Sequence, residues 1–316
     1  MIDIVSKQIS LRTAKASAIV ICAEETITQI KNNTLPKGNL LDIAKAAGLL
    51  GAKKTAELIP HCHPISIDYL NIDYEILSAS EIEKKEPAYH KNKPGILITV
   101  TGKVISKTGL EMEVLTSASI TALTIYDLLK PIDKSIEILA TKLLEKEGGR
   151  TDAKNQIKHN ITAAVLVCSD STAAGKRKDN SGIIIQEILN EYNVDIKEYK
   201  IIPDNPDEIQ NQIRKWAEED IHFVFTTGGT GLGPRDKTVD AVKDICEKDA
   251  PGISETMRNY GVQRTSWAMH SRSYAGSLHK TLIICMPGSS NGARESLEAI
   301  LPGVFHARKM LKGGGH

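Results

Sequence analysis

Residues 145–160 read EKEGGRTDAKNQIKHN, and residues 161–168, which follow directly, read ITAAVLVC. The first segment has paired glycines, many charges and almost no apolar side chain, so it predicts a solvated connection. The second is a continuous apolar run of strand length, which is typical of the first strand of a buried parallel sheet. This boundary predicts two domains, 1–150 and 161–316, joined by a linker at 151–160.

The length and composition of the chain fit two ordinary globular domains. With 316 residues it exceeds the usual size of one domain, and each half can bury a core. Forty basic and 39 acidic residues give a net charge of +1, which argues against strong binding to nucleic acid or a membrane surface. Five scattered cysteines without a CxxC pair fit reduced thiols. No signal peptide and no long apolar run are evident, so we expect a cytoplasmic protein.

Apolar periodicity in the first half predicts two helices with strands between them. The helices are predicted at 40–59 and about 116–130, and the strands at 67–76 and 96–105. Pro60 ends the first helix, and Thr116 or Ser117 is available to cap the second. A polar, Lys-rich segment at 83–94 joins the strands. This order predicts an α+β domain of ferredoxin-like type, an antiparallel sheet with helices on one face.

Four ionisable residues in this half form a candidate site. Asp127 and Lys130 stand three residues apart on the second predicted helix, so they share a face. Glu111 and Glu113 precede that helix and point the same way if the backbone is extended. Ala-rich neighbours can dehydrate these groups and shift their pKa values. A surface ion pair on an amphipathic helix is the favoured interpretation of any one pair, whereas the four groups together favour a site.

The sequence His61-Cys62-His63 has three interpretations. Imidazole and thiolate are both good metal ligands, so a zinc-binding regulator is one of them. An extended strand would place His61 and His63 on one face and Cys62 on the other, without a second ligand motif nearby. A core or surface histidine, and a catalytic or phosphate-contacting residue, are the other interpretations.

Five blocks in the first half occur together and in order. They are MIDIVSK at 1–7, PKGN at 36–39, LIPHCHP at 58–64, TGLEMEVL at 108–115 and ALTIYDLLK at 122–130. With these blocks, residues 1–150 closely resemble the MoaC family, the cyclic pyranopterin monophosphate synthases of molybdenum cofactor biosynthesis. The resemblance implies rearrangement of 3′,8-cyclo-7,8-dihydro-GTP into cyclic pyranopterin monophosphate with release of diphosphate.

The same resemblance implies roles for particular residues. It places Lys37, Lys130, Asp127, His63, Glu111 and Glu113 at catalytic positions. It places Arg12, Lys53 and Lys146 at phosphate-binding positions, and Cys62 and Met112 at other substrate-binding positions. A lysine beside a carboxylate in a partly buried site can be tuned as a general acid, which agrees with this assignment.

The second half has the pattern of a three-layer, doubly wound α/β sheet. Apolar strands at 161–168, 222–226 and 280–286 run into polar or Gly-rich turns, with helices at about 183–189 and 291–301. The turn TGGTGLGPRD at 227–236 lacks the Lys-Ser/Thr of a P-loop and the GxGxxG spacing of dinucleotide-binding folds. Its glycines still allow backbone N–H groups to converge on an anion.

With SDS at 169–171, DNSG at 179–182, SRSYAG at 271–276 and PGS at 287–289, residues 161–312 resemble the MoaB/MogA family. The resemblance implies binding of molybdopterin and its adenylylation by ATP. It makes Asp204 and Asp236 the functional acids, with Asp204 suited to Mg²⁺. It places Gly228, Gly229, Thr230 and Gly231 along the pterin and phosphate pocket, and Ser271 and Ser273 among the substrate-binding residues. A non-catalytic pterin-binding or assembly module is the alternative.

The leading hypothesis is therefore a fused, bifunctional enzyme of molybdenum cofactor biosynthesis. The two reactions are not consecutive, because sulfur is added to the first product before adenylylation. Both families form assemblies with threefold symmetry, so we expect a trimer or hexamer that holds the two activities in equal amounts. We expect no tightly bound cofactor; Mg²⁺ and ATP would serve the C-terminal domain.

Overall fold

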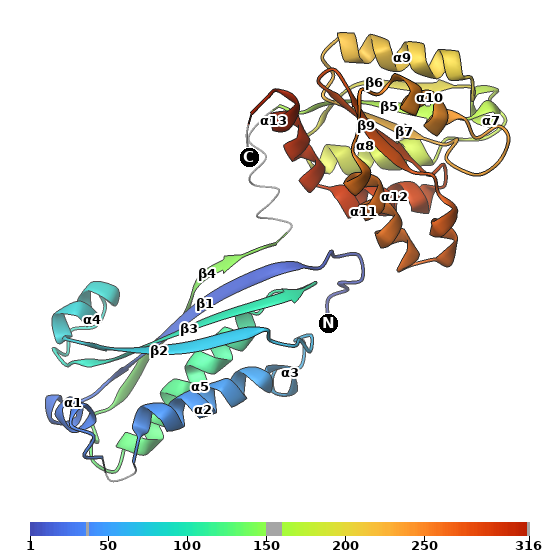
Figure 1. Ribbon diagram of the computed structural model, residues 1–316. Helices are drawn as coiled ribbons and strands as arrows, with labels where there is room; N and C mark the ends of the chain where they lie inside the picture. Colours follow the sequence, from blue (N-terminus) through green and yellow to red (C-terminus); the bar gives the residue numbers. More distant parts are fainter. Residues whose placement is uncertain (36–37, 150–159, 315–316) are drawn as a thin grey trace. The chain divides into compact units, whose positions relative to one another are not determined.

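The computed structural model describes residues 1–35, 38–149 and 160–314 (Figure 1). The chain divides into two compact units, Met1–Asp152 and Ala153–His316, and each is described by itself. Of the predicted linker at 151–160, only Asn160 is among the described residues. Residues 145–147, which the sequence assigned to a solvated connection, belong instead to the last strand of the first unit.

The first unit is built on a four-stranded sheet. Its strands lie in the order β2-β3-β1-β4, and every neighbouring pair is antiparallel. The strands are β1 (Ser10–Ile21), β2 (Tyr69–Leu77), β3 (Gly95–Ser106) and β4 (Glu137–Glu147). The predicted strands at 67–76 and 96–105 correspond to β2 and β3, whereas β1 and β4 were not predicted.

Most helices of this unit cover one face of the sheet (Figure 1). They are α1 (Glu24–Lys31), α2 (Leu40–Lys53), α3 (Thr55–Leu58) and α5 (Glu111–Leu129). Alternate β1 residues, Ala14, Ala16 and Ala18, are buried in the core beneath α2 and α5. Their small side chains let the helices approach the sheet closely.

One helix departs from the predicted single-face arrangement. Helix α4 (Ala79–Lys85) precedes and ends inside the 83–94 segment, which the sequence suggested was only a polar connection. Its Ile82 is buried with Ile19 and Ile21 of β1, whereas neighbouring Ala18 and Val20 belong to the core under α2 and α5. Because side chains alternate along a strand, α4 covers the opposite face at this end of the sheet.

Helix α5 begins five residues earlier than the sequence predicted. It starts at Glu111, and its N-cap is Leu110, without a side-chain cap from Thr116 or Ser117. By length and composition alone this helix could cross a membrane, as the mean hydropathy of its best window is 1.2. In this unit its buried residues pack against β1, β3 and α2, so it is a core helix of the domain.

The second unit is a six-stranded sheet in the order β6-β5-β7-β10-β9-β8. The first four strands are parallel, and β9 and β8 are antiparallel to their neighbours. The strands are β5 (Thr162–Cys168), β6 (Asp195–Ile202), β7 (Phe223–Thr227), β8 (Lys248–Asp249), β9 (Tyr274–Leu278) and β10 (Thr281–Met286). The predicted strands at 161–168, 222–226 and 280–286 correspond to β5, β7 and β10.

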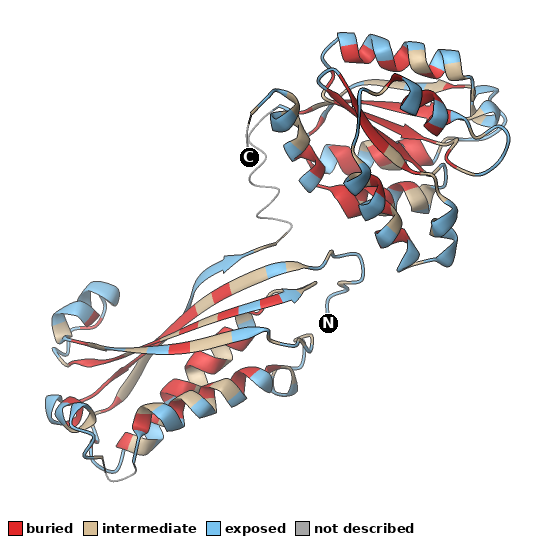
Figure 2. Ribbon diagram, viewed as in Figure 1, coloured by how far each residue is buried: buried red, intermediate tan, exposed pale blue. Residues whose placement is uncertain are grey.

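Helices cover both faces of this sheet, as the doubly wound pattern predicted. One face packs against α8 (Ser181–Glu191), α11 (Pro251–Val262), α12 (Ser290–Ile300) and α13 (Ala307–Leu311). The other packs against α9 (Pro206–Glu218) and α10 (Thr238–Ile245). Short elements complete the unit: α7 (Asp170–Ala173), η1 (Ser266–His270) and η2 (Gly303–His306). Figure 2 shows the central strands as the most deeply buried part of this unit.

Candidate functional site

A group of ionisable side chains surrounds the start of α5. The first turn of this helix carries Glu111 and Glu113, of which Glu113 is buried with 4% of its surface exposed. Lys146 on β4 approaches Glu111, with 3.8 Å between Nζ and Oε1. Arg12 on β1 stands two residues from Ala14, which pairs with Lys146, so Arg12 and Lys146 share the face of the sheet that α5 covers. The Nε atom of Arg12 is buried and finds no hydrogen-bond partner in the described part of the chain. We call Arg12, Glu111, Glu113, Lys146 and Cys62 the helix-start cluster.

The carboxylates of this cluster occupy different environments. Burial raises the pKa of Glu113, with the neighbouring Glu111 adding to the effect, although its own backbone N–H opposes it. The sequence predicted that both glutamates point the same way from an extended segment. That prediction is wrong, because a helical turn separates residues two apart by about 200°, so Glu113 points inward while Glu111 stays partly exposed.

The His61-Cys62-His63 segment lies in a turn after α3, not in a strand. The Cys62 N–H donates to the Ile59 carbonyl at 3.0 Å, which closes the turn. Burial raises the pKa of the Cys62 thiol, and Glu113 and Glu111 raise it further, so Cys62 faces the helix-start cluster. His61 contacts the N-terminal amine of Met1 through Nδ1 at 3.5 Å. His63 is half-buried, and the structure gives it no close ionic partner among the described residues.

Asp127 and Lys130 lie at the other end of α5. Their Oδ1 and Nζ atoms are 2.6 Å apart, and more than half of each side chain is exposed. The hydrogen bond and charge of Asp127 raise the pKa of Lys130. Lys130 is therefore held as a cation, and not dehydrated by the neighbouring alanines as the sequence suggested.

The expected single cluster of Glu111, Glu113, Asp127 and Lys130 is therefore wrong within one chain. Sixteen residues of helix separate Glu111 from Asp127, which at 1.5 Å per residue is about 24 Å. Of the remaining expected residues, Lys37 lies outside the described residues, and Lys53 is exposed at the last turn of α2. Met112 is partly exposed in the first turn of α5.

In the second unit, four parallel strands bring their carboxyl ends to one edge of the sheet. Asp170 follows β5, Asp204 follows β6, Gly228 follows β7 and Pro287 follows β10. The ends of neighbouring parallel strands meet at the same edge, which is where ligands bind in doubly wound sheets.

Asp204 and Asp170 are held against each other by reciprocal hydrogen bonds. The Asp204 N–H donates to Asp170 Oδ1 at 3.0 Å, and the Asp170 N–H donates to Asp204 Oδ2 at 3.4 Å. The second oxygen of Asp204, Oδ1, is buried without a hydrogen-bond partner in the described ranges. Burial raises the pKa of Asp204, and the charges of Asp170 and Asp236 add to this, while the Asp170 N–H and Arg235 oppose it.

Two glycines of the 227–236 turn are required by its backbone. Gly228 has φ +101°, and a Cβ there would lie 2.1 Å from the Cys168 carbonyl oxygen. Gly229 has φ +60°, and its Cβ would lie 2.1 Å from Thr238 Oγ1. The chain thus turns sharply at the strand end and brings its backbone close to the neighbouring strand.

Asp236 and Arg272 hold the rest of this turn in place. Asp236 Oδ2 accepts the Gly233 N–H at 2.8 Å. Arg272 donates through its backbone N–H to Thr230, through Nε to Gly231 at 2.9 Å, and through Nη2 to the Asp236 carbonyl. Its Nη1 reaches both carboxylate oxygens of Asp240. Thr230 is 5% exposed, so its side chain is not an open surface of the site.

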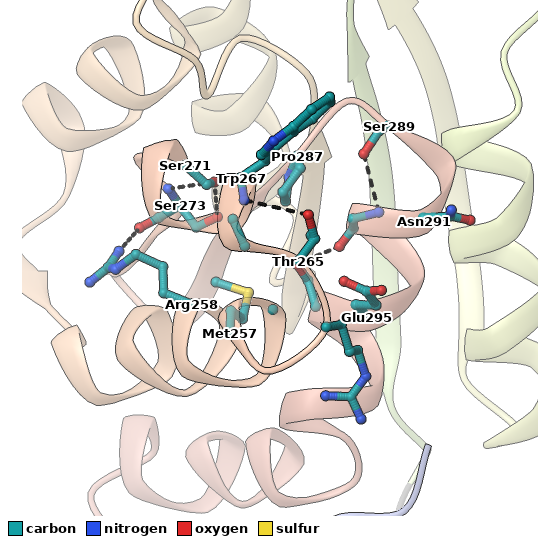
Figure 3. A pocket seen from close by; sticks show the side chains of 15 residues that line it. Met257, Arg258, Thr265, Trp267, Ser271, Ser273, Pro287, Ser289, Asn291 and Glu295 are labelled. Carbon is teal, nitrogen blue, oxygen red and sulfur yellow. Dashed lines mark hydrogen bonds between the residues drawn. The ribbon is translucent and has the colours of Figure 1, made fainter. Parts of the chain in front are cut away.

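Ser271 and Ser273 lie beside a pocket of about 440 Å³ between α11, η1 and α12 (Figure 3). Their hydroxyl oxygens are 2.7 Å apart. Arg258 donates to the Ser273 carbonyl at 2.7 Å, which fixes the segment that carries both serines. Pro287 and Ser289, from the turn after β10, complete this side of the pocket.

The site offers no preformed metal centre in the residues described. Among residues 1–35, 38–149 and 160–314, no three His, Cys, Asp or Glu side chains are grouped to hold a metal ion. This leaves the zinc interpretation of His61 and His63 without a third ligand in those ranges. Mg²⁺ commonly binds through one or two carboxylates and substrate phosphates, so Asp204 remains a suitable ligand.

Comparison with known proteins matches both units. Residues 1–149 match the MoaC family, and residues 164–306 match the family described as "Probable molybdopterin binding domain". A molybdenum cofactor biosynthesis bifunctional protein of Chlorobaculum tepidum is 39% identical over 316 residues, covering 100% of this chain and 96% of that protein. The chain belongs to the family of bifunctional molybdenum cofactor biosynthesis proteins. It joins a MoaC domain to a molybdopterin-binding domain of the MoaB/MogA type.

Two further relatives agree with this family assignment, and one solved structure is similar to part of the chain. The bifunctional protein of Synechococcus elongatus is 34% identical over 327 residues, covering 100% of this chain and 98% of that protein. A cyclic pyranopterin monophosphate synthase of Syntrophomonas wolfei is 40% identical over 151 residues, which are 48% of this chain and 88% of that protein. A crystal structure of the molybdopterin biosynthesis enzyme MoaB from Thermus thermophilus has 39% identity over 48% of this chain and 97% of that chain, with TM-score 0.47.

Two residues of this bifunctional protein's C-terminal site were not selected from the sequence. The SDS block contains Asp170 without implying a role for it, although a carboxylate just after a buried strand of a doubly wound sheet indicates a site residue. Arg272 was recognised only as part of the SRSYAG block. Its side-chain contacts with Gly231 and Asp240, which are 41 and 32 positions away, depend on the fold, so the local sequence could not reveal them.

Proposed function

We propose that the MoaC domain converts 3′,8-cyclo-7,8-dihydro-GTP into cyclic pyranopterin monophosphate and diphosphate. The helix-start cluster supports this, because the buried Nε of Arg12 and the nearby Lys146 offer donors to a polyphosphate. Glu113, whose pKa is raised by burial, suits proton transfer to or from the substrate. The protonated Lys130 suits the stabilisation of negative charge as diphosphate leaves.

We further propose that a second copy of the chain completes this site. One small substrate cannot touch groups that α5 holds about 24 Å apart, so the helix-start cluster of one copy must meet Asp127 and Lys130 of another. A twofold interface would produce two such sites per pair of chains. The expected threefold assembly, a trimer or hexamer, remains a prediction; a hexamer contains such pairs.

The observation that carries the MoaC assignment is the match of residues 1–149 together with the charged groups at both ends of α5. The test is formation of cyclic pyranopterin monophosphate by the purified full chain. Lys130→Ala should lower kcat by at least about 100-fold, because it removes a cation from the developing charge. Lys134→Ala, an exposed lysine four residues further on, is the matched control and should keep wild-type activity.

For the second unit we propose adenylylation of molybdopterin. The terminal phosphate oxygen of molybdopterin attacks the α-phosphorus of ATP; the new P–O bond forms as the bond to the β-phosphate oxygen breaks, and diphosphate leaves. The carboxyl edge of the sheet supports this, because Gly228 and Gly229 bring backbone close to the site while Asp204 and Asp170 face it. Mg²⁺, bound with ATP, would neutralise phosphate charge.

The buried, unpartnered Oδ1 of Asp204 carries this part of the proposal. Such an oxygen needs a partner that the described chain does not supply, and a hydrated Mg²⁺ would satisfy it. Arg272 and Asp236 keep the glycine turn in a fixed conformation around the phosphates.

The test is formation of adenylylated molybdopterin from ATP and molybdopterin. Asp204→Asn should abolish turnover, and Asp236→Asn should reduce it strongly. Asp207→Asn, an exposed carboxyl in the first turn of α9, should leave it unchanged. A clean wild-type chain that binds molybdopterin but transfers no adenylyl group would instead establish the non-catalytic module.

Two smaller inferences accompany these proposals. We infer a ferredoxin-like fold for the first unit, supported by its antiparallel strand order β2-β3-β1-β4 and by the helices that connect β1 to β2 and β3 to β4. A cytoplasmic location and the absence of a tightly bound cofactor stay predictions of the sequence.

A further inference from the structure

The pocket between α11, η1 and α12 contains a carboxyl group that neither proposed reaction has used. Glu295 on α12 lines this pocket and is half-buried. It makes no hydrogen bond or ion pair with any residue in the described ranges. Figure 3 places it across from Thr265, facing the cavity. A half-buried carboxyl without a partner favours a ligand that brings hydrogen-bond donors.

The charged groups around Glu295 do not satisfy it. Burial raises its pKa, whereas the charge of Arg264 lowers it and that of Glu298 raises it. Arg264 is committed elsewhere, because its Nη1 donates to the Tyr260 carbonyl at 2.8 Å and its guanidinium lies 3.2 Å from the centre of the Tyr260 ring. Glu298 accepts the Tyr260 hydroxyl at 2.9 Å and does not line the pocket.

The rim of the same pocket carries an exposed indole. Trp267 on η1 has 81% of its surface exposed, whereas Trp216, the other tryptophan of the sequence, is fully buried. Figure 3 shows Trp267 beside Pro287, at the mouth of the cavity. A large aromatic surface left in water beside a concave site is typical of a face that a planar ligand covers.

We propose that Glu295 and Trp267 select the pterin ring of molybdopterin: Glu295 accepts its 2-amino and ring N–H groups, while Trp267 stacks on its face. This inference rests on the proposed molybdopterin binding and deepens it. Two adjacent N–H donors match the two oxygens of one carboxylate, which gives a paired, charge-assisted contact. The pocket volume of about 440 Å³ suits a small fused ring system.

The same chemistry excludes the second substrate from this pocket. Adenine presents an amino donor beside a ring nitrogen that can only accept, and a carboxylate repels that acceptor. ATP therefore binds elsewhere, at the strand edge near Asp204, and its adenine does not compete for the pocket. Guanine presents the same donor pair as a pterin, so guanine should compete where adenine does not.

The test measures the binding of neopterin to the full chain. Calorimetry gives the affinity, and tryptophan fluorescence reports the stacking. Glu295→Gln should weaken neopterin binding by about 10- to 100-fold, because the amide replaces one acceptor with a donor. Glu298→Gln, one turn further along the same helix, should bind as the wild type does. Trp267→Ala should weaken binding by roughly fivefold or more, and Trp267→Phe should retain most of it.

Fluorescence reports the stacking separately. Neopterin should quench the emission of wild-type chain and leave that of Trp267→Phe unchanged, because only buried Trp216 remains there. GMP should displace neopterin, and AMP should not.

Several results would overturn the inference. Unchanged neopterin affinity in Glu295→Gln, or displacement by AMP, would remove Glu295 as the selecting group. If the fluorescence of Trp267 changes with protein concentration but not with neopterin, Trp267 lies at a contact between copies of the chain and does not bind the pterin. If adenylyl transfer proceeds normally in these cases, the proposed function stands; loss of both binding and transfer in the wild type would reject both.

Discussion

Glu111 and Asp127 lie at opposite ends of one helix, with sixteen residues and about 24 Å between them. Each carries a charged neighbour, since Lys146 approaches Glu111 and Lys130 pairs with Asp127. The buried acid Glu113 and the unpartnered Nε of Arg12 lie at one end of this helix, and the Asp127–Lys130 pair lies at the other. This arrangement is the reason to assign the MoaC reaction to a site shared between two copies.

Mixing two inactive variants tests the shared site. Lys130→Ala and Glu111→Gln damage opposite ends of α5, so a mixed pair of chains contains one intact site and one doubly damaged site. Co-expression with two affinity tags in equal amounts should restore about a quarter of wild-type cyclic pyranopterin monophosphate formation, given random pairing at a twofold interface. Mixtures as inactive as the separate variants would mean that each site is built within one chain.

The stability of the MoaC domain should depend on Asp133. This carboxyl is 6% exposed, and burial alone would raise its pKa, but hydrogen bonds from the Ala23 N–H, Ser135 and Thr26 lower it to about 2. Relative to an ordinary value of 3.8, the shift corresponds to about 2 kcal/mol of stability. That contribution is complete above pH 3.8 and is lost as the pH falls through about 2.

Asp133→Asn should therefore lower the unfolding free energy of this domain by about 2 kcal/mol at pH 7, with a smaller deficit at lower pH. Calorimetry of the full chain at several pH values measures the difference. Glu83→Gln, an exposed carboxyl on α4, serves as the control and should change stability very little. A pH-independent effect would show that the loss is steric and not ionic.

Gly228 should not tolerate a side chain. In Gly228→Ala the new Cβ would meet the Cys168 carbonyl oxygen at 2.1 Å while φ stays near +101°. We expect adenylyl transfer to be lost and the C-terminal domain to be destabilised by about 1–3 kcal/mol or more. Gly252→Ala in the first turn of α11 meets no atom within 4 Å and should be neutral or slightly stabilising. Equal behaviour of the two variants would contradict the assigned turn geometry.

Arg272 should act as a positioning residue for the glycine turn. Lysine cannot contact Gly231, Asp236 and Asp240 simultaneously, because it lacks the planar fork of arginine. Arg272→Lys should lower kcat of adenylyl transfer by roughly 10- to 100-fold with a smaller change in KM for ATP. Arg294→Lys on the exposed face of α12 is the matched control. A change in KM alone would indicate direct substrate binding by Arg272.

The sequence predicted the parts of this protein that depend on local patterns. The run at 161–168 identified β5 because a buried parallel strand is continuously apolar, and the GGTG turn was correctly placed at a strand end. The start of α5 was missed because Glu111-Met112-Glu113 shows no capping signal, although all three residues favour helix. Strands β1 and β4 were missed as well.

The sequence could not predict the distances in space between the candidate site residues. Asp127 and Glu111 are close in the sequence, and both belong to blocks that resemble the MoaC family. Because one continuous helix carries both residues, they cannot contact the same small substrate within one chain. The partners of Arg272 and the pocket around Glu295 likewise arise from segments that folding brings together. Contacts between distant segments produce no local periodicity in the sequence, so they could not be predicted from it.

The most direct test of the central claim, that the chain contributes to two independent kinds of active site, is to assay both reactions on three proteins. The full wild-type chain should form cyclic pyranopterin monophosphate and adenylylated molybdopterin. Lys130→Ala should lose the first activity and keep the second, whereas Asp204→Asn should show the reverse. If either substitution abolishes both activities while the protein stays folded, or if the wild type performs only one reaction, the two-site account is contradicted.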